Sequence, residues 1–157
     1  MNSPITSTLG PVEQEITGTA LQGTLVDMID LSLVAKQAHW NVIGRQFRDV
    51  HLALDELVIT ARLYTDTVAE RAAAIGWSPD GRAATVSSTS GVPAFEKGWT
   101  KDTEVVPFIV TALAAVVSRL RERIEATDKA DTVTQDLLIE ITAKLEEAHW
   151  MWQAQNS

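Results

Sequence analysis

The stretch FRDVHLALDELVITARLYTDTVAERAAAIG, residues 47–76, decides the fold, because it carries two different surfaces on one helix. Apolar residues recur every three or four positions, which predicts a helix from about Phe47 to Ile75 with Gly76 capping its end. On a helical wheel of about 100° per residue they gather on one side. These residues are Val50, Leu54, Leu57, Ala61 and Val68. The stretch therefore predicts an amphipathic helix with its apolar side in a core.

Another stripe of the same helix carries four side chains that are able to bind metal ions. His51 and Asp55 are four residues apart, and so are Asp66 and Glu70, which places each pair on one face. All four lie within about 100° of one another on the wheel and point away from the apolar side. Asp55 and Asp66 are separated by roughly 16 Å of helical rise. One straight helix therefore cannot bring both pairs to the same ion.

A two-fold contact between two copies of the chain would join the pairs. The midpoint between positions 51 and 70 coincides with the midpoint between 55 and 66, and it falls between positions 60 and 61. An antiparallel contact centred there sets His51 against Glu70 of the partner subunit and Asp55 against Asp66 of the partner subunit. Apolar residues on the same stripe would complete the contact: Leu52, Ile59 and Leu63.

One helical pattern precedes this stretch and two follow it. The first runs from about Pro11 to Trp40, and the short turn after it makes the first two helices antiparallel neighbours. The others run over about 102–127 and 131–154. The last of these patterns is marked by Val133, Leu137, Ile141 and Leu145.

Residues 77–101 are rich in Ser, Thr, Gly and Pro and form a longer segment than a simple loop between two helices needs. We therefore expect this segment to cross the length of the bundle. Two helices, a long crossover and two helices predict an all-α, ferritin-like four-helix bundle. We expect residues 1–157 to form a single domain, with 1–10 as a flexible N-terminal tail.

His39, near the end of the first helix, joins the stripe because a short hairpin brings it beside the first turns of the next helix. Each site would then hold His39, His51 and Asp55 of one chain with Asp66 and Glu70 of the partner subunit. Imidazole and carboxylate ligands without thiolate suit Fe(II), and Zn(II), Mn(II) or Co(II) accept the same set. The alternative is that the stripe is the solvated face of an amphipathic helix, and the residue pattern alone leaves both open.

Composition limits the classes of function. The chain has no cysteine, which excludes a disulfide framework and a thiolate metal site. Its formal charge is −8, and no Lys or Arg precedes Lys36, which disfavours a nucleic-acid binder and favours small cations as partners. We find neither a signal peptide nor an uninterrupted apolar run of spanning length, and we expect a cytoplasmic protein without membrane contact.

A single Glu146-x-x-His149 lacks the second motif of an intra-bundle di-iron centre, so we interpret His149 as structural.

Three segments together resemble the signature of the Dps family of mini-ferritins: KQAHWNVIG at 36–44, HLALD at 51–55 and DTVAER at 66–71. The resemblance extends over nearly the whole chain. It implies a hollow homododecamer with inter-subunit ferroxidase centres that oxidise Fe(II), in many members with hydrogen peroxide rather than O2. It also implies that His39, His51, Asp66 and Glu70 bind a tighter iron and Asp55 a weaker second one. Trp40 matches the tryptophan beside that centre.

The same resemblance suggests iron entry through three-fold pores near the start of the last helix. Asp131, Asp136 and Glu140 are the candidates, and the alternative is that they offset the dipole of that helix. DNA binding in the family depends in several members on a lysine-rich tail, which this chain lacks, so we expect little DNA affinity. Association with the nucleoid is the alternative to a purely cytoplasmic location. Arg62 lies within the metal stripe and would pair with a carboxylate or reach solvent.

Overall fold

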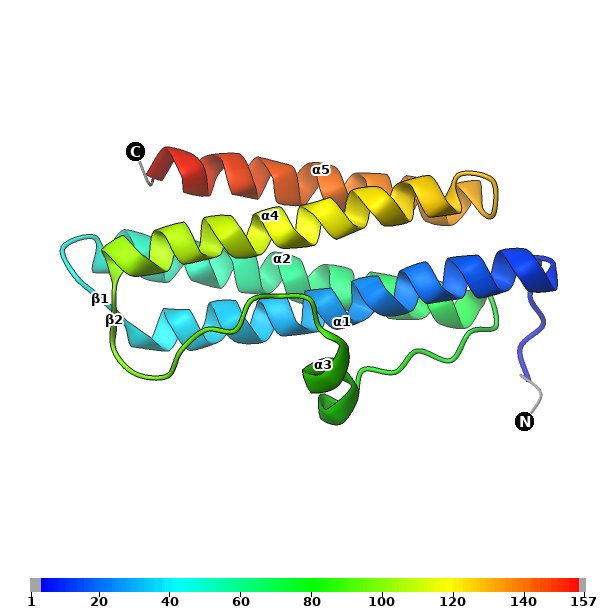
Figure 1. Cartoon of the computed structure of the whole chain (residues 1–157), viewed down its shortest axis with the longest axis horizontal. Coiled ribbons are helices and arrows are strands. Elements are labelled where there is room, and N and C mark those ends of the chain that lie inside the picture. The colour runs from blue at the N-terminus through cyan, green and yellow to red at the C-terminus, as the bar shows by residue number, and fades with distance from the viewer. Residues whose placement is uncertain (1–3, 156–157) are drawn as a thin grey trace.

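The computed structural model describes residues 4–155 and shows a bundle of four long helices with a shorter helix on its side (Figure 1). The elements in chain order are α1 Pro11–Asn41, β1 Val42–Ile43, α2 Phe47–Ala74, α3 Ala83–Thr89, β2 Thr100–Lys101, α4 Asp102–Thr127 and α5 Thr132–Gln155. The four predicted helices are confirmed to within a residue or two at each end. The all-α bundle with a long crossover is confirmed as well.

The core lies between two helical hairpins, α1 with α2 and α4 with α5. All five apolar residues that the α2 pattern singled out are buried. Val133 is wrong as a core position, because it is 62% exposed. The buried positions of α5 begin one residue later, at Thr134, and Val133 is turned about 100° away from them.

The crossover contains structure that the sequence pattern did not predict. It forms α3 and then β2, which pairs in parallel with β1 so that Val42 lies opposite Thr100. Beside this pair Gly44 has φ of +135°, and a Cβ there would lie 2.3 Å from the Asp102 carboxylate. That carboxylate accepts the Gln46 N–H at 2.6 Å. The α1–α2 turn is therefore fixed to the start of α4.

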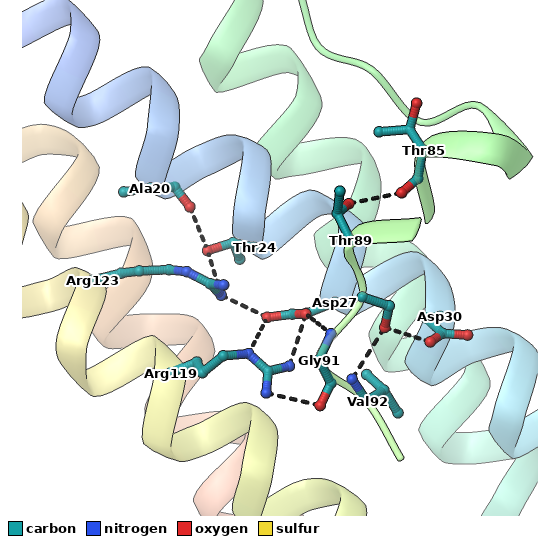
Figure 2. A network of polar contacts seen from close by, with 11 residues as sticks. Ala20, Thr24, Asp27, Asp30, Thr85, Thr89, Gly91, Val92, Arg119 and Arg123 are labelled. Atoms are coloured by element: carbon teal, nitrogen blue, oxygen red, sulfur yellow. Dashed lines mark hydrogen bonds and ion pairs between the residues drawn. The ribbon is translucent and has the colours of Figure 1, made fainter. Parts of the chain in front are cut away.

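A buried carboxylate on α1 ties the crossover to α4 (Figure 2). Asp27 is 1% exposed and accepts hydrogen bonds from Arg119, at 2.8 and 3.0 Å, and from Arg123, at 2.7 Å. Gly91 of the crossover donates its N–H to Asp27 at 3.3 Å and accepts from Arg119 at 2.8 Å. Three separate parts of the chain thus meet at one carboxylate.

By length and composition, α4 is apolar enough to cross a membrane. Its large apolar residues are buried or half-buried in the bundle, and the exposed positions of its central part are Thr111, Ala114 and Ser118. The apolar character of α4 is therefore explained by its place in the core.

The N-terminal segment runs beside the end of α2. Leu9 packs against the core, and the backbone at Ile5 and Ser7 lies next to Gly76, which has φ of +77°. Flexibility of 1–10 stays a prediction, and its first three residues lie outside those that the structure describes.

Candidate metal centre

Two histidine rings face each other across the α1–α2 hairpin. His39 and His51 are stacked, with ring centroids 3.6 Å apart and planes inclined by 20°. Nδ1 of each ring lies 2.8 Å from the backbone oxygen of the other residue. Because a carbonyl only accepts, each Nδ1 carries the proton, and Nε2 keeps the lone pair that a metal ion needs. The hairpin therefore holds two imidazole rings in fixed orientations, and their role as metal ligands stays a prediction.

Asp55 lies one helical turn beyond His51, and its Oδ1 is 3.8 Å from His39 Nδ1. The same oxygen accepts a short hydrogen bond from the Lys36 ammonium, and the two form an ion pair. This hydrogen bond is the main reason why the pKa of Asp55 lies below its usual value. Asp55 is therefore ionised at neutral pH. Sequence reasoning missed Lys36, although it precedes His39 by three residues and so shares its face.

The second pair of predicted ligands lies elsewhere on α2. Asp66 and Glu70 are both exposed. Among residues 4–155 no three His, Asp or Glu side chains of one chain are close enough to hold a metal ion. His39 thus lies near both His51 and Asp55, but these three side chains do not form a group that could hold a metal ion by themselves. Asp66 and Glu70 lie further along α2, as the helical rise requires.

Exposed apolar residues lie on α2 on the same stripe as the two predicted ligand pairs. Leu52, Ile59 and Leu63 are 46%, 67% and 62% exposed. Three large apolar side chains in a row on one exposed helix face are typical of a contact surface. Arg62 is exposed on the same helix.

Aromatic residues lie around the histidine pair. Trp40 is 63% exposed, and the Lys36 Nζ lies 6.0 Å from the centre of its ring. The Phe47 ring lies 5.0 Å from that of His51, centroid to centroid. Trp40 follows His39 directly in the chain, and its place beside a metal centre stays a prediction.

The three pore candidates differ in their surroundings. Asp131 is 8% exposed, forms an ion pair with Arg71, and accepts hydrogen bonds from the N–H and hydroxyl of Thr134. This geometry favours the role of an N-cap for α5. Asp136 and Glu140 are exposed, and their pore role stays a prediction.

Burial, and then the nearby Glu140, raise the pKa of Tyr64.

Replacing the α5 cap is expected to lower stability in a pH-dependent way. Burial opposes ionisation of Asp131, but hydrogen bonds from Thr134 and Arg71 outweigh it and hold its pKa below the usual value. A lowered pKa stabilises the fold above the unfolded-state value of about 4, and this contribution is lost as pH falls through the folded-state value. We expect Asp131→Asn to cost about 1–3 kcal/mol at pH 7.

The measurement is urea unfolding of parent and variant at pH 7 and at pH 3.5, at one subunit concentration. The difference between them should shrink at the lower pH. A difference independent of pH would contradict the role of the ionised carboxylate.

The motif Glu146-x-x-His149 does not form a second site within the described chain. Glu146 accepts a hydrogen bond from Arg121 at 2.6 Å, and His149 Nε2 is buried with no hydrogen-bond partner among the described residues. The structural interpretation of His149 stays a prediction.

Comparison with known proteins gives a consistent result. A model of the ferritin-like domain matches residues 18–157. The DNA protection during starvation protein 2 of Deinococcus radiodurans is 35% identical over 135 residues, which cover 86% of this chain and 56% of that protein. The DNA protection during starvation protein of Agrobacterium fabrum is 33% identical over 135 residues, covering 85% and 83%. The chain thus spans little more than half of the first of these relatives.

The solved structure of Dps from Microbacterium arborescens, in the high iron form, is similar with a TM-score of 0.90. It is 30% identical, and the similarity covers 96% of this chain and 97% of that one. The ferritin-like connectivity predicted from the helix order is confirmed.

Proposed function

This chain belongs to the Dps family of ferritin-like proteins, and from that premise we propose that it stores and detoxifies iron. It oxidises Fe(II), with hydrogen peroxide as the oxidant, at centres shared between two subunits. The ferric product is kept as an oxyhydroxide inside a hollow homododecamer. The observation that carries this proposal is the histidine pair, whose reciprocal bonds to backbone oxygens leave both Nε2 atoms free for a metal ion.

Each centre is made of two halves. His39, His51 and Asp55 come from one subunit, and Asp66 and Glu70 from its partner. The exposed residues Leu52, Ile59 and Leu63 support this arrangement, because they lie on the same stripe as the ligands and provide the apolar surface that a two-fold contact needs. Imidazole nitrogens and carboxylate oxygens suit Fe(II), and Zn(II) or Mn(II) would compete for them.

The oxidation uses electrons in pairs. Two Fe(II) ions lose one electron each, and hydrogen peroxide takes both electrons and two protons to give two water molecules. Because both electrons arrive together, no hydroxyl radical is released. The fixed imidazoles hold the ions, while the ionised Asp55 offsets their positive charge. Protection from oxidative damage follows from this stoichiometry.

Charge supports the storage role. Twelve subunits at −8 each would carry about −96 in total, which attracts Fe(II). Asp136 and Glu140 are exposed near the start of α5, where we place the entry pore. The role of N-cap of α5 accounts for the position of Asp131 without a pore.

The relatives' names mention DNA protection, and we propose that this chain protects by removing iron and peroxide rather than by coating DNA. The residues before Lys36 include no Lys or Arg, so these residues offer phosphates no basic side chain. We place the protein in the cytoplasm. A gel-retardation assay at physiological salt should show no stable complex with duplex DNA.

The test of the ferroxidase centre is rapid mixing of peroxide with the anaerobic, Fe(II)-loaded oligomer while ferric absorbance is followed. We expect fast oxidation of about two Fe(II) per peroxide in the parent. The Asp66→Asn, Glu70→Gln variant should be slower by at least about tenfold, because half of each centre has lost its charge.

A matched control removes two exposed carboxylates elsewhere, Glu122→Gln with Glu125→Gln on α4, and should oxidise like the parent. All three proteins are compared at the same assembly state. Equal slow rates in all of them would mean that the α2 stripe is only a solvated helix face.

A further inference from the structure

Basic side chains that form no ion pair within residues 4–155 gather at one end of the bundle. The chain has 13 Lys and Arg residues, and seven of them pair with Asp or Glu side chains. Four of the other six lie around the β1–β2 pair, where α1 turns into α2 and the crossover enters α4 (Figure 1). These four are Arg45, Arg48, Lys97 and Lys101, and all are exposed. An acidic chain thus carries a cationic cluster at this end.

The cluster borders an open cavity of about 750 Å³ between the α1–α2 turn and the start of α4. Polar side chains from four separate parts of the chain line it. They are Arg45 and Gln46 from the turn, Lys101 from β2, Thr103 from α4 and Gln155 from the end of α5. The β1–β2 register sets Lys101 opposite Ile43, two residues before Arg45, so that both basic residues line the same cavity.

The acidic residue of this cavity is occupied by other donors. Asp102 is 6% exposed, and its carboxylate accepts the N–H of Gln46 at 2.6 Å and that of Thr103 at 2.8 Å. These backbone dipoles offset its charge. The exposed Asp49 and Glu96 lie on the same segments but do not line the cavity. The basic side chains are therefore left to meet a ligand.

We propose that this cavity binds a small phosphate-bearing anion. The ligand is inorganic phosphate or the phosphate end of a compound such as a nucleotide, and the volume lies within the usual range of small-molecule sites, about 300–1,000 Å³. This inference stands on the cationic cluster and the cavity, and it does not depend on the iron centre.

The arrangement of the donors favours a phosphate over a carboxylate. The guanidinium of Arg45 offers two parallel N–H groups, and the ammonium of Lys101 offers a compact charge, and both groups commonly bind phosphate oxygens. The Thr103 hydroxyl and the Gln155 amide add donors from two other elements. Donors that converge from several directions match tetrahedrally placed oxygens, whereas the two oxygens of a carboxylate lie in one plane.

Charge also favours a small ligand over a long polyanion. Binding of a nucleic-acid backbone depends on many basic side chains spread along its path. Here four cations lie in one place on a chain whose formal charge is −8, so phosphates further along a polymer would meet an acidic surface. A single phosphate group avoids this repulsion.

The test is titration calorimetry of the assembled, metal-free protein with inorganic phosphate at pH 8, where phosphate is doubly charged. Sodium chloride of equal ionic strength is the blank. We expect saturable binding of one phosphate per subunit. Arg45→Gln with Lys101→Gln should weaken it at least about tenfold, because both charge-assisted hydrogen bonds are lost.

Two matched variants make the result specific. Lys129→Gln with Lys144→Gln removes the same charge from exposed positions on other parts of the chain and should bind phosphate like the parent. Lys129 lies in the turn between α4 and α5, at the opposite end of the bundle (Figure 1). Arg45→Lys with Lys101→Arg keeps both charges and should keep saturable binding. All proteins are compared at the same assembly state.

A nucleoside triphosphate as a second probe distinguishes the two sources of phosphate. Tighter binding than inorganic phosphate, lost in Arg45→Gln with Lys101→Gln, would identify a larger compound as the ligand, and equal binding would identify phosphate itself. No saturable binding in the parent, or equal weakening in the Lys129 and Lys144 variant, would overturn the proposal in favour of diffuse attraction. Displacement of bound phosphate by duplex DNA at lower concentration would overturn it in favour of a nucleic-acid surface.

Discussion

Mixing two inactive variants is expected to restore Fe(II) oxidation to about a quarter of the parent's activity per subunit. The first variant, His39→Gln with His51→Gln, lacks the histidine half of the centre. The second, Asp66→Asn with Glu70→Gln, lacks the carboxylate half. Each alone should fall to the background rate. Co-expression at equal levels, followed by purification of the oligomer, gives the mixture to be assayed.

The size of the recovery follows from the two-fold contact. Random pairing makes half of the dimers mixed. A mixed dimer has one centre with both defects and one centre with none, so one of its two centres is intact. About a quarter of all centres should therefore oxidise Fe(II). A centre built within one chain would give no recovery.

Two controls make this recovery interpretable. The first control is a chain that carries all four substitutions, mixed with the parent. Dimers of this chain with the parent contain no intact centre, so the mixture tests for changes in assembly alone. Mixing the separately assembled oligomers without dissociation should stay at background. Recovery in that last mixture would contradict subunit sharing, because it would show that activity arises without new contacts.

The sequence predicted the fold well because its information is local. Apolar spacing along α2 placed Leu54, Ala61 and Val68 in the core, and the same spacing on α5 failed by one residue at Val133. A register error of this kind arises where one apolar residue lies at the edge of the apolar face. The helix α3 was missed because its sequence, AATVSST, gives no periodic apolar signal.

The candidate site was predictable as a pattern of ligands but not as a set of contacts. Spacing placed His51 beside Asp55, and the short hairpin placed His39 beside both, as the structure now has them. Spacing does not say which atom of a ring carries the proton. It did not reveal that Lys36 reaches Asp55 from the neighbouring helix, since the signal there is only a lysine one turn from His39.

Replacing Asp27 with alanine is expected to cause the largest loss of stability of any single change considered, about 3–5 kcal/mol. Its side chain is 2% exposed and lies between two guanidinium groups, those of Arg119 and Arg123 (Figure 2). Removing the carboxylate leaves two positive charges half-enclosed with no counter-charge. For a fold whose total stability is typically about 5–15 kcal/mol, this is a large fraction.

The measurement is urea unfolding of Asp27→Ala beside the parent at equal subunit concentration, because assembly adds to apparent stability. The control is Arg121→Ala, which removes the exposed ion pair with Glu146 and should change stability by less than about 0.5 kcal/mol. Equal midpoints for Asp27→Ala and the parent would mean that water replaces the carboxylate at little cost.

A triple variant distinguishes charge from attachment as the source of the loss. Asp27→Leu with Arg119→Met and Arg123→Met removes all the buried charges and fills their space, which is neutral or stabilising where an ion network alone is at stake. Gly91 would still lose its bonds to Asp27 and Arg119. We would then expect the triple variant to recover the parent's stability while hydrogen exchange around Gly91 becomes faster. This result would mean that the unpaired charges cause the loss of stability, whereas the hydrogen bonds of Gly91 hold the crossover in place. If the triple variant stays as unstable as Asp27→Ala, the attachment of the crossover is what stabilises the bundle.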